Sequence, residues 1–185
     1  KPMTFADDKC DPVKGEVTED FTASMQQPKV SVRYMFSGEM PYTLKNKAAL
    51  SFLTQALNSR YLVSIREEKG GKNADYIPYL KNGVQVSGST EYIPSETYNM
   101  TISFDTNEEM ADELREIVMK EIEEIAANGP KSEDIEKNRE FMLKSWKNSL
   151  EQNASWMNYL NSKYGSGLDY LADYEEVLKT LTDAD

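Results

Sequence analysis

The sequence predicts an α+β domain in which helices cover one face of an antiparallel sheet. Up to residue 104, four stretches alternate apolar and polar side chains, a pattern typical of half-buried strands. One amphipathic stretch separates the second of them from the third, and apolar side chains recur at steps of three and four after residue 105. The resulting order is strand-strand-helix-strand-strand-helices. It favours hairpins with segregated helices over a parallel sheet.

The first predicted hairpin covers residues 16–36. Within 16–25, polar side chains alternate with Val17, Phe21, Ala23 and Met25, with Glu19 as the one exception. After Pro28 the alternation resumes, with Val30, Val32, Tyr34 and Phe36 on one face. Both segments are therefore predicted as strands with one buried face.

A long helix is predicted next. Its apolar side chains recur at helical steps, namely Ala49, Leu50, Phe52, Leu53, Ala56, Leu57, Tyr61, Leu62 and Ile65. Glycine favours the left-handed conformation that ends many helices, so we expect this helix to stop at Gly70-Gly71.

The second hairpin is predicted between residues 84 and 104. Residues 72–82 contain asparagine, aspartate and proline, and Asn82-Gly83 is a turn pair, so this stretch is expected to be a loop. Two alternating segments follow, at 84–92 and 98–104, and Pro94-Ser95 separates them. They are predicted to form an antiparallel pair.

Four helices are predicted in the remainder. Residues 106–109 (Thr-Asn-Glu-Glu) match a capping box in which Thr106 caps the first, and Gly129-Pro130 ends it. Ser132 is expected to cap the second. The third should end at Gly165, and Asp169 should cap the fourth.

Residues 1–14 lack any period and are predicted to be a connecting arm, with residues 15–185 as a single domain. Residues 182–185 (Thr-Asp-Ala-Asp) look like the start of a further helix. We therefore expect the domain to be truncated at both ends.

Composition restricts the function. With 21 Lys and Arg against 32 Asp and Glu, the formal net charge is −11, which argues against nucleic acid and anionic membrane surfaces as partners. No apolar run is long enough to insert into a bilayer. The chain has one cysteine, Cys10, and no histidine, so a Ser-His-Asp triad and a histidine-based zinc site are both impossible within it. We predict no catalytic residue, metal ligand or cofactor in this chain.

Several strings, in this order and spacing, resemble the C-terminal half of insulinase-like or pitrilysin-like zinc metallopeptidases, and particularly the last domain of the long bacterial envelope members. The strings lie at 60–71, 83–94, 102–114, 128–140, 153–160 and 165–170. The resemblance implies a clamshell of two homologous halves around a chamber. Zinc is then expected in the N-terminal half, on an H-x-x-E-H motif carried by the same polypeptide or by a partner subunit. This chain would be the lid that binds the peptide substrate, and the bacterial periplasm is favoured over the cytoplasm.

Within this resemblance, the family's substrate-binding arginine falls on Arg66. A guanidinium at that place can hold a peptide backbone and stabilise charge on the scissile carbonyl oxygen. A surface arginine paired with Glu67 or Glu68 is the alternative.

The family's substrate-binding tyrosine has no direct counterpart. Counting seven residues from Arg66 gives Asn73, whereas aligning on the following strand gives Asn82. Tyr76 and Tyr79 lie in the intervening insertion and could substitute. The candidate substrate-binding residues are therefore Arg66, Tyr76, Tyr79 and Asn82.

Other candidates are given structural roles. The aromatic residues Trp146, Trp156, Tyr159 and Tyr164 are predicted to pack in the core or between domains. Glu121, Glu123 and Glu124 are predicted to lie on a solvated helix face.

The leading hypothesis is a zinc-free lid domain of a metallopeptidase that hydrolyses peptides in a closed chamber, inactive on its own. The alternative is a catalytically inactive, peptidase-like scaffold or peptide-binding subunit. An H-x-x-E-H motif in the same reading frame would separate the two hypotheses.

Overall fold

The computed structural model describes residues 14–24, 26, 28–67 and 83–182. It contains an antiparallel sheet of three strands, β1 (Val30–Glu39), β2 (Gln85–Glu91) and β3 (Thr97–Thr106), in the order β1-β3-β2. β3 is central and pairs with both neighbours, for example Tyr34 opposite Ile102 and Val86 opposite Ile102. The predicted fold class is confirmed.

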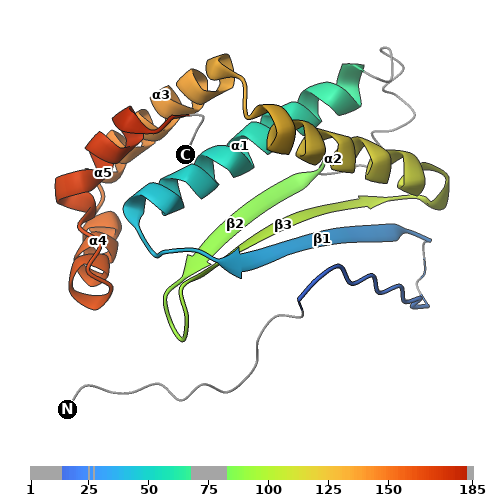
Figure 1. Cartoon of the computed structure of the whole chain (residues 1–185), viewed down its shortest axis with the longest axis horizontal. Coiled ribbons are helices and arrows are strands. Elements are labelled where there is room, and N and C mark those ends of the chain that lie inside the picture. The colour runs from blue at the N-terminus through green and yellow to red at the C-terminus, as the bar shows by residue number, and fades with distance from the viewer. Residues whose placement is uncertain (1–13, 25, 27, 68–82, 183–185) are drawn as a thin grey trace.

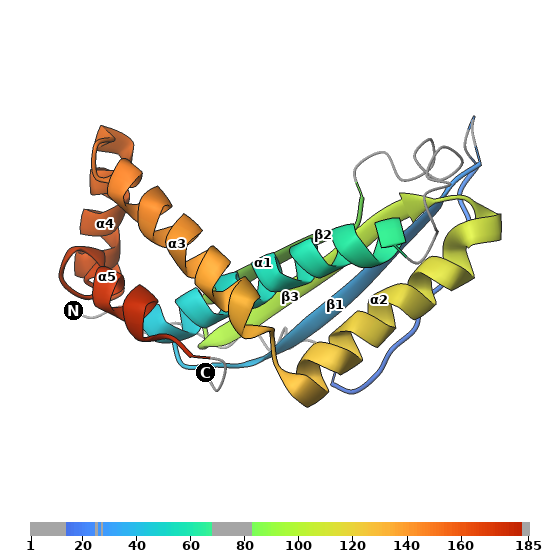
Figure 2. The same ribbon diagram turned by 90° about the horizontal axis from the view of Figure 1, so that it is seen from above.

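Five helices accompany the sheet. They are α1 (Leu44–Glu67), α2 (Glu108–Asn128), α3 (Ser132–Ser149), α4 (Asn153–Gly165) and α5 (Tyr170–Thr180). Figure 1 shows α1 and α2 on the same face of the sheet, while α3, α4 and α5 gather beside the beginning of α1. Figure 2 shows α1 running from these helices to the far end of the sheet. Within the described residues, no helix is long and apolar enough to cross a bilayer.

Two hydrophobic clusters form the core, and α1 contributes to both. The first lies between the sheet and helices α1 and α2, and includes Leu57, Tyr61, Ile102, Leu114 and Val118. The second joins the beginning of α1 to the C-terminal helices, and includes Ala48, Phe52, Trp146 and Leu178. Apolar side chains on different sides of one helix therefore hold the sheet and the helical group together.

The three strands follow the alternation in the sequence. The predicted strands at 30–36, 84–92 and 98–104 are confirmed, and the side chains of Val32, Val86 and Ile102 are buried under the helices. β1 continues to Glu39, three residues beyond the predicted strand.

The strand predicted at 16–25 is wrong. The described residues of this segment have no strand pairing, and Val17 and Phe21 are exposed. Alternation indicates that a segment can bury one face, but it does not determine which sheet edge the segment will join.

Two predicted helix caps are shifted by one residue. Asn107, rather than Thr106, caps α2, because its side-chain oxygen accepts a hydrogen bond from Met110 N at 2.9 Å. Thr106 is instead the buried last residue of β3, opposite Val30. Lys131 occupies the N-cap of α3 and Ser132 is its first helical residue. A capping residue can be placed only once the end of the preceding element is known.

The other helix ends behave as predicted. Gly129 ends α2 with φ of 71° and its N–H donates to Ile125 O at 2.8 Å, while α4 ends at Gly165. Asp169 caps α5 by accepting from Ala172 N at 3.2 Å. The Gly70-Gly71 cap, the arm before residue 14 and residues 183–185 lie outside the described residues.

A set of side-chain hydrogen bonds links the beginning of β1 to the end of β3. Asp105 accepts hydrogen bonds from Lys29 Nζ at 2.8 Å and from Ser31 Oγ at 2.6 Å. These bonds hold the pKa of Asp105 below its ordinary value of 3.8. A depressed carboxyl pKa contributes stability that is present above the unfolded-state pKa and is lost as the pH falls through the folded-state pKa.

Asp105→Asn is therefore expected to lower the free energy of unfolding at pH 7 by less than about 1 kcal/mol, since exposed ion pairs are screened by solvent. The difference from the unsubstituted chain should shrink as the pH falls below 3.8. Urea unfolding at pH 7 and at acid pH measures it. Asp112→Asn is the control, because this aspartate lies at the surface of α2 with only an i,i+3 pair to Arg115. A loss for Asp105→Asn that stays constant with pH would contradict the assignment.

Candidate functional site

Arg66 lies in the last turn of α1, at the end of the helix remote from α3, α4 and α5. The other candidate residues, Tyr76, Tyr79 and Asn82, lie outside the described residues. The described geometry therefore bears on one question, which is how firmly the fold holds the helix that carries Arg66.

The beginning of α1 is tied to the end of β2. Lys47 Nζ donates to Thr90 Oγ1 at 2.8 Å and lies 4.6 Å from the centre of the Tyr42 ring. The Tyr42 ring packs in turn on Tyr92, with 4.9 Å between ring centroids. A hydrogen bond and a cation-π contact thus fix this end of the helix against the sheet.

The middle of α1 covers the outer edge of β2. Asn58 Nδ2 donates to Val86 O, and Val86 N donates to Asn58 Oδ1, both at 3.0 Å. The two backbone groups of Val86 point away from β3, so this side chain completes the hydrogen bonding of an edge strand. At Gly88 a Cβ atom would lie 2.9 Å from Leu50 Cγ, and only glycine allows so close an approach of helix to strand.

The last turns of α1 are fixed to α2. The buried hydroxyl of Tyr61 donates to Val118 O at 3.1 Å, and Ser64 donates to the carboxylate of Glu121. Arg60 Nη1 lies 3.4 Å from Glu121 Oε2, with side chains that are 10% and 12% exposed. Burial, and then the charge of Glu121, raises the pKa of Tyr61. These contacts end two residues before Arg66.

The sequence analysis placed Glu121 on a solvated helix face, and this prediction is wrong because the side chain is buried. It is buried because its position continues the apolar row of Ile117, Val118 and Ile125, so that it faces α1. Arg60 Nη2 also lies 3.6 Å from Glu124 Oε1, at the exposed border of the pair. The spacing of Glu121 from its apolar neighbours was the signal available in the sequence.

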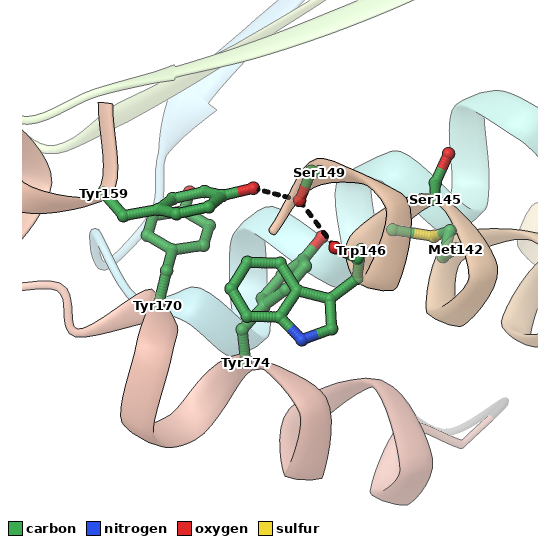
Figure 3. A pocket seen from close by; sticks show the side chains of 7 residues that line it. All are labelled: Met142, Ser145, Trp146, Ser149, Tyr159, Tyr170 and Tyr174. Atoms are coloured by element: carbon green, nitrogen blue, oxygen red, sulfur yellow. Dashed lines mark hydrogen bonds between the residues drawn. The ribbon is translucent and has the colours of Figure 1, made fainter. Parts of the chain in front are cut away.

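A second feature is a pocket of about 220 Å³ among α3, α4 and α5 (Figure 3). Its wall is a ring of four aromatic side chains with neighbouring centroids 4.9–5.4 Å apart, Trp146, Tyr159, Tyr170 and Tyr174. Ser149 Oγ donates a hydrogen bond to Trp146 O at 2.6 Å and forms a second hydrogen bond with Tyr159 OH at 2.5 Å. Burial raises the pKa of both Tyr170 and Tyr174.

These contacts confirm a packing role for two of the four aromatic residues singled out from the sequence. Trp146 and Tyr159 belong to the second core cluster. Trp156 and Tyr164 are exposed on α4. Tyr170 and Tyr174 complete the ring, and their i,i+4 spacing was the signal for it.

In the part of the chain that the structure covers, no three histidine, cysteine, aspartate or glutamate side chains converge to hold a metal ion. The full sequence contains no histidine. An arginine side chain, such as that of Arg66, can supply hydrogen-bond donors for carbonyl or carboxylate oxygens.

Comparison with known proteins places the chain in a family. Residues 7–142 match the family model described as the Peptidase M16 inactive domain. A search of curated protein sequences finds no match.

Solved structures share the fold. The periplasmic protease PqqL from Escherichia coli superposes with a TM-score of 0.70 at 18% identity, over 86% of this chain and 17% of that protein. An M16-like peptidase from Alicyclobacillus acidocaldarius gives a TM-score of 0.59 at 16% identity, over 86% of this chain and 36% of that protein. This chain therefore spans less than two-fifths of either relative. Its match to the family model over residues 7–142 shows that it belongs to the M16 peptidase family, as a non-catalytic, inactive domain of the insulinase-like type.

Proposed function

We propose that this domain is the lid of an M16 metallopeptidase, closing over a peptide and orienting it for hydrolysis by another half of the protein. The observation that carries the proposal is the absence of histidine from a chain that belongs to this family. The inverted zinc motif needs two histidines, so this chain can serve the reaction only by binding and positioning.

Arg66 is the residue proposed to act on the substrate. Three sets of contacts, at Lys47, Asn58 and the Arg60-Glu121 pair, hold the helix that carries Arg66 against the sheet and α2. A positioned guanidinium can hold a peptide carbonyl and stabilise the negative charge that develops on it. Tyr76, Tyr79 and Asn82 are proposed to line the same substrate channel.

The zinc is proposed to lie in a homologous half that carries H-x-x-E-H, in the same polypeptide or in a partner subunit. There it would supply an activated water for attack on the peptide bond. This chain has no histidine to supply that motif, and in the described ranges no three acidic or cysteine side chains converge. We propose the bacterial periplasm as the compartment, since PqqL is described as a periplasmic protease.

Arg66→Ala in the full-length protein tests the proposal. We expect kcat/KM for a peptide substrate to fall by about 100-fold, the size of effect seen when one donor to a developing oxyanion is removed. The zinc content of the protein should stay the same. Arg33→Ala is the matched control, because Arg33 lies on an exposed position of β1, and it should leave kcat/KM unchanged.

An unchanged kcat/KM for Arg66→Ala would remove this residue from the proposed substrate site. If neither half of the full-length protein carried two zinc-ligating histidines, the peptidase hypothesis would be contradicted. The alternative, a catalytically inactive scaffold, would then be favoured.

A further inference from the structure

The segment before β1 has the pattern of a strand but no strand partner within the described residues. Residues 14–24 run without helix or strand along the outer side of β1, in the opposite direction to it, in both views (Figures 1 and 2). Phe21 is 91% exposed and Val17 is 56% exposed. This segment alternates apolar and polar residues, yet its large apolar side chains are exposed to solvent. Such a composition is typical of a strand that pairs with a sheet outside the described residues.

The segment belongs to the domain rather than to a linker. It falls inside residues 7–142, which match the family model. Folding of this chain alone leaves its apolar positions uncovered, whereas the corresponding positions of β1, Val32 and Phe36, contact the first core cluster. Among the described residues, the large apolar side chains of this segment are therefore left without cover.

The solved relatives are much longer than this chain, and the covering partner is sought in that additional polypeptide. This chain accounts for 17% of PqqL and 36% of the Alicyclobacillus protein, so most of each relative is additional polypeptide. A strand is covered by main-chain pairing at a sheet edge together with a groove for alternate side chains. The edge strand of a further sheet in the additional polypeptide could supply both.

We propose that residues 16–24 add as a strand to the sheet of an adjoining domain of the same M16 protein, with Val17 and Phe21 buried in that domain. This inference deepens the proposed function, since it rests on the chain acting beside other M16 domains. Glu16, Glu19 and Asp20 give the strand an acidic character. The accepting strand should carry basic or neutral side chains opposite them, because like charges directly opposite destabilise a strand pair.

The test uses the full-length protein and two measurements. Phe21 is replaced by the photo-crosslinking residue p-benzoylphenylalanine, and the crosslinked peptides are identified by mass spectrometry. Hydrogen exchange is measured for the amides of residues 17–24 in the unsubstituted protein. We expect crosslinks to peptides outside residues 1–185, and exchange about 100-fold slower than at Ser95, which lies in the turn between β2 and β3.

Phe141 provides a matched control, because it is an exposed phenylalanine on α3, a helix that lies away from the segment in Figure 1. The same replacement there should give a different set of crosslinked peptides. Crosslinks from position 21 to β1 of this chain, crosslinks shared with position 141, no crosslinks, or fast exchange at residues 17–24 would each overturn the proposal. Neither measurement depends on peptidase activity, so its failure is distinguishable from a failure of the Arg66 experiment.

Discussion

Replacing Glu121 by alanine is expected to lower the free energy of unfolding by about 3–5 kcal/mol. The carboxylate lies 3.4 Å from the guanidinium of Arg60, and both side chains are almost fully buried between α1 and α2. Removing Glu121 leaves the Arg60 charge in a poorly solvated place and deprives Ser64 of its acceptor. The cost comes mainly from the charge that remains, rather than from the attraction that is lost.

Glu124→Ala is the matched control. Glu124 is also paired with Arg60, at 3.6 Å, but its side chain is 46% exposed. An exposed ion pair contributes about 0–1 kcal/mol to stability. The free energy of unfolding of this variant should therefore stay within about 1 kcal/mol of that of the unsubstituted chain. The double variant Arg60→Met/Glu121→Leu removes both buried charges and fills their space, and it should recover most of the loss.

Denaturant unfolding of the four chains, followed by circular dichroism, measures these differences. Equal losses of unfolding free energy for Glu121→Ala and Glu124→Ala would show that burial does not determine how much each ion pair of Arg60 contributes to stability. A double variant as unstable as Glu121→Ala would show that the polar network, and not the isolated charge, provides the stability.

Trp146→Ala is expected to cost about 3–5 kcal/mol as well, the usual effect of deleting a buried aromatic side chain. Trp146 is 5% exposed and contacts Tyr159 and Tyr174, with 4.9 Å and 5.3 Å between ring centroids. Trp146 contacts two of the other three rings and is buried between α3, α4 and α5, so its removal opens the cluster that joins these helices.

The second tryptophan of the chain is the control. Trp156 is 42% exposed on α4, where its Nε1 donates to Leu150 O at 2.7 Å. Trp156→Ala should cost about 1 kcal/mol, mostly from that hydrogen bond. Urea unfolding with tyrosine and tryptophan fluorescence compares the two variants. A Trp156→Ala chain less stable than Trp146→Ala would contradict the burial shown by the structure.

Most of the fold could be predicted from the sequence because local patterns determine it. Alternation located β1, β2 and β3, and Gly129 and Asp169 marked helix ends through their own backbone and side-chain preferences. The strand at 16–25 was wrong because pairing depends on which edge is available in three dimensions.

Less of the candidate site could be predicted. Arg66 was placed at the end of a helix by glycine and periodicity, and the structure puts it in the last turn of α1. The contact of Asn58 with the backbone of Val86 could not be foreseen, since it joins residues 28 positions apart through groups that carry no sequence pattern. The burial of Glu121 was not predicted, because its acidic neighbours Glu123 and Glu124 favoured a solvated helix face for all three residues.

The sharing of α1 between two core clusters has a mechanical consequence. A helix of 24 residues is about 36 Å long at a rise of 1.5 Å per residue. Ala48 and Phe52, near the beginning of α1, are embedded among the C-terminal helices, whereas Arg66 lies near the other end of α1. The helix therefore connects the helical group mechanically to the end that carries Arg66. From Ala48 to Arg66 the helix is roughly 27 Å long at this rise, so a tilt of the helix and its sheet by about 3° about the helical group would move the Arg66 end by about 1.4 Å. That displacement is enough to make or break a hydrogen bond.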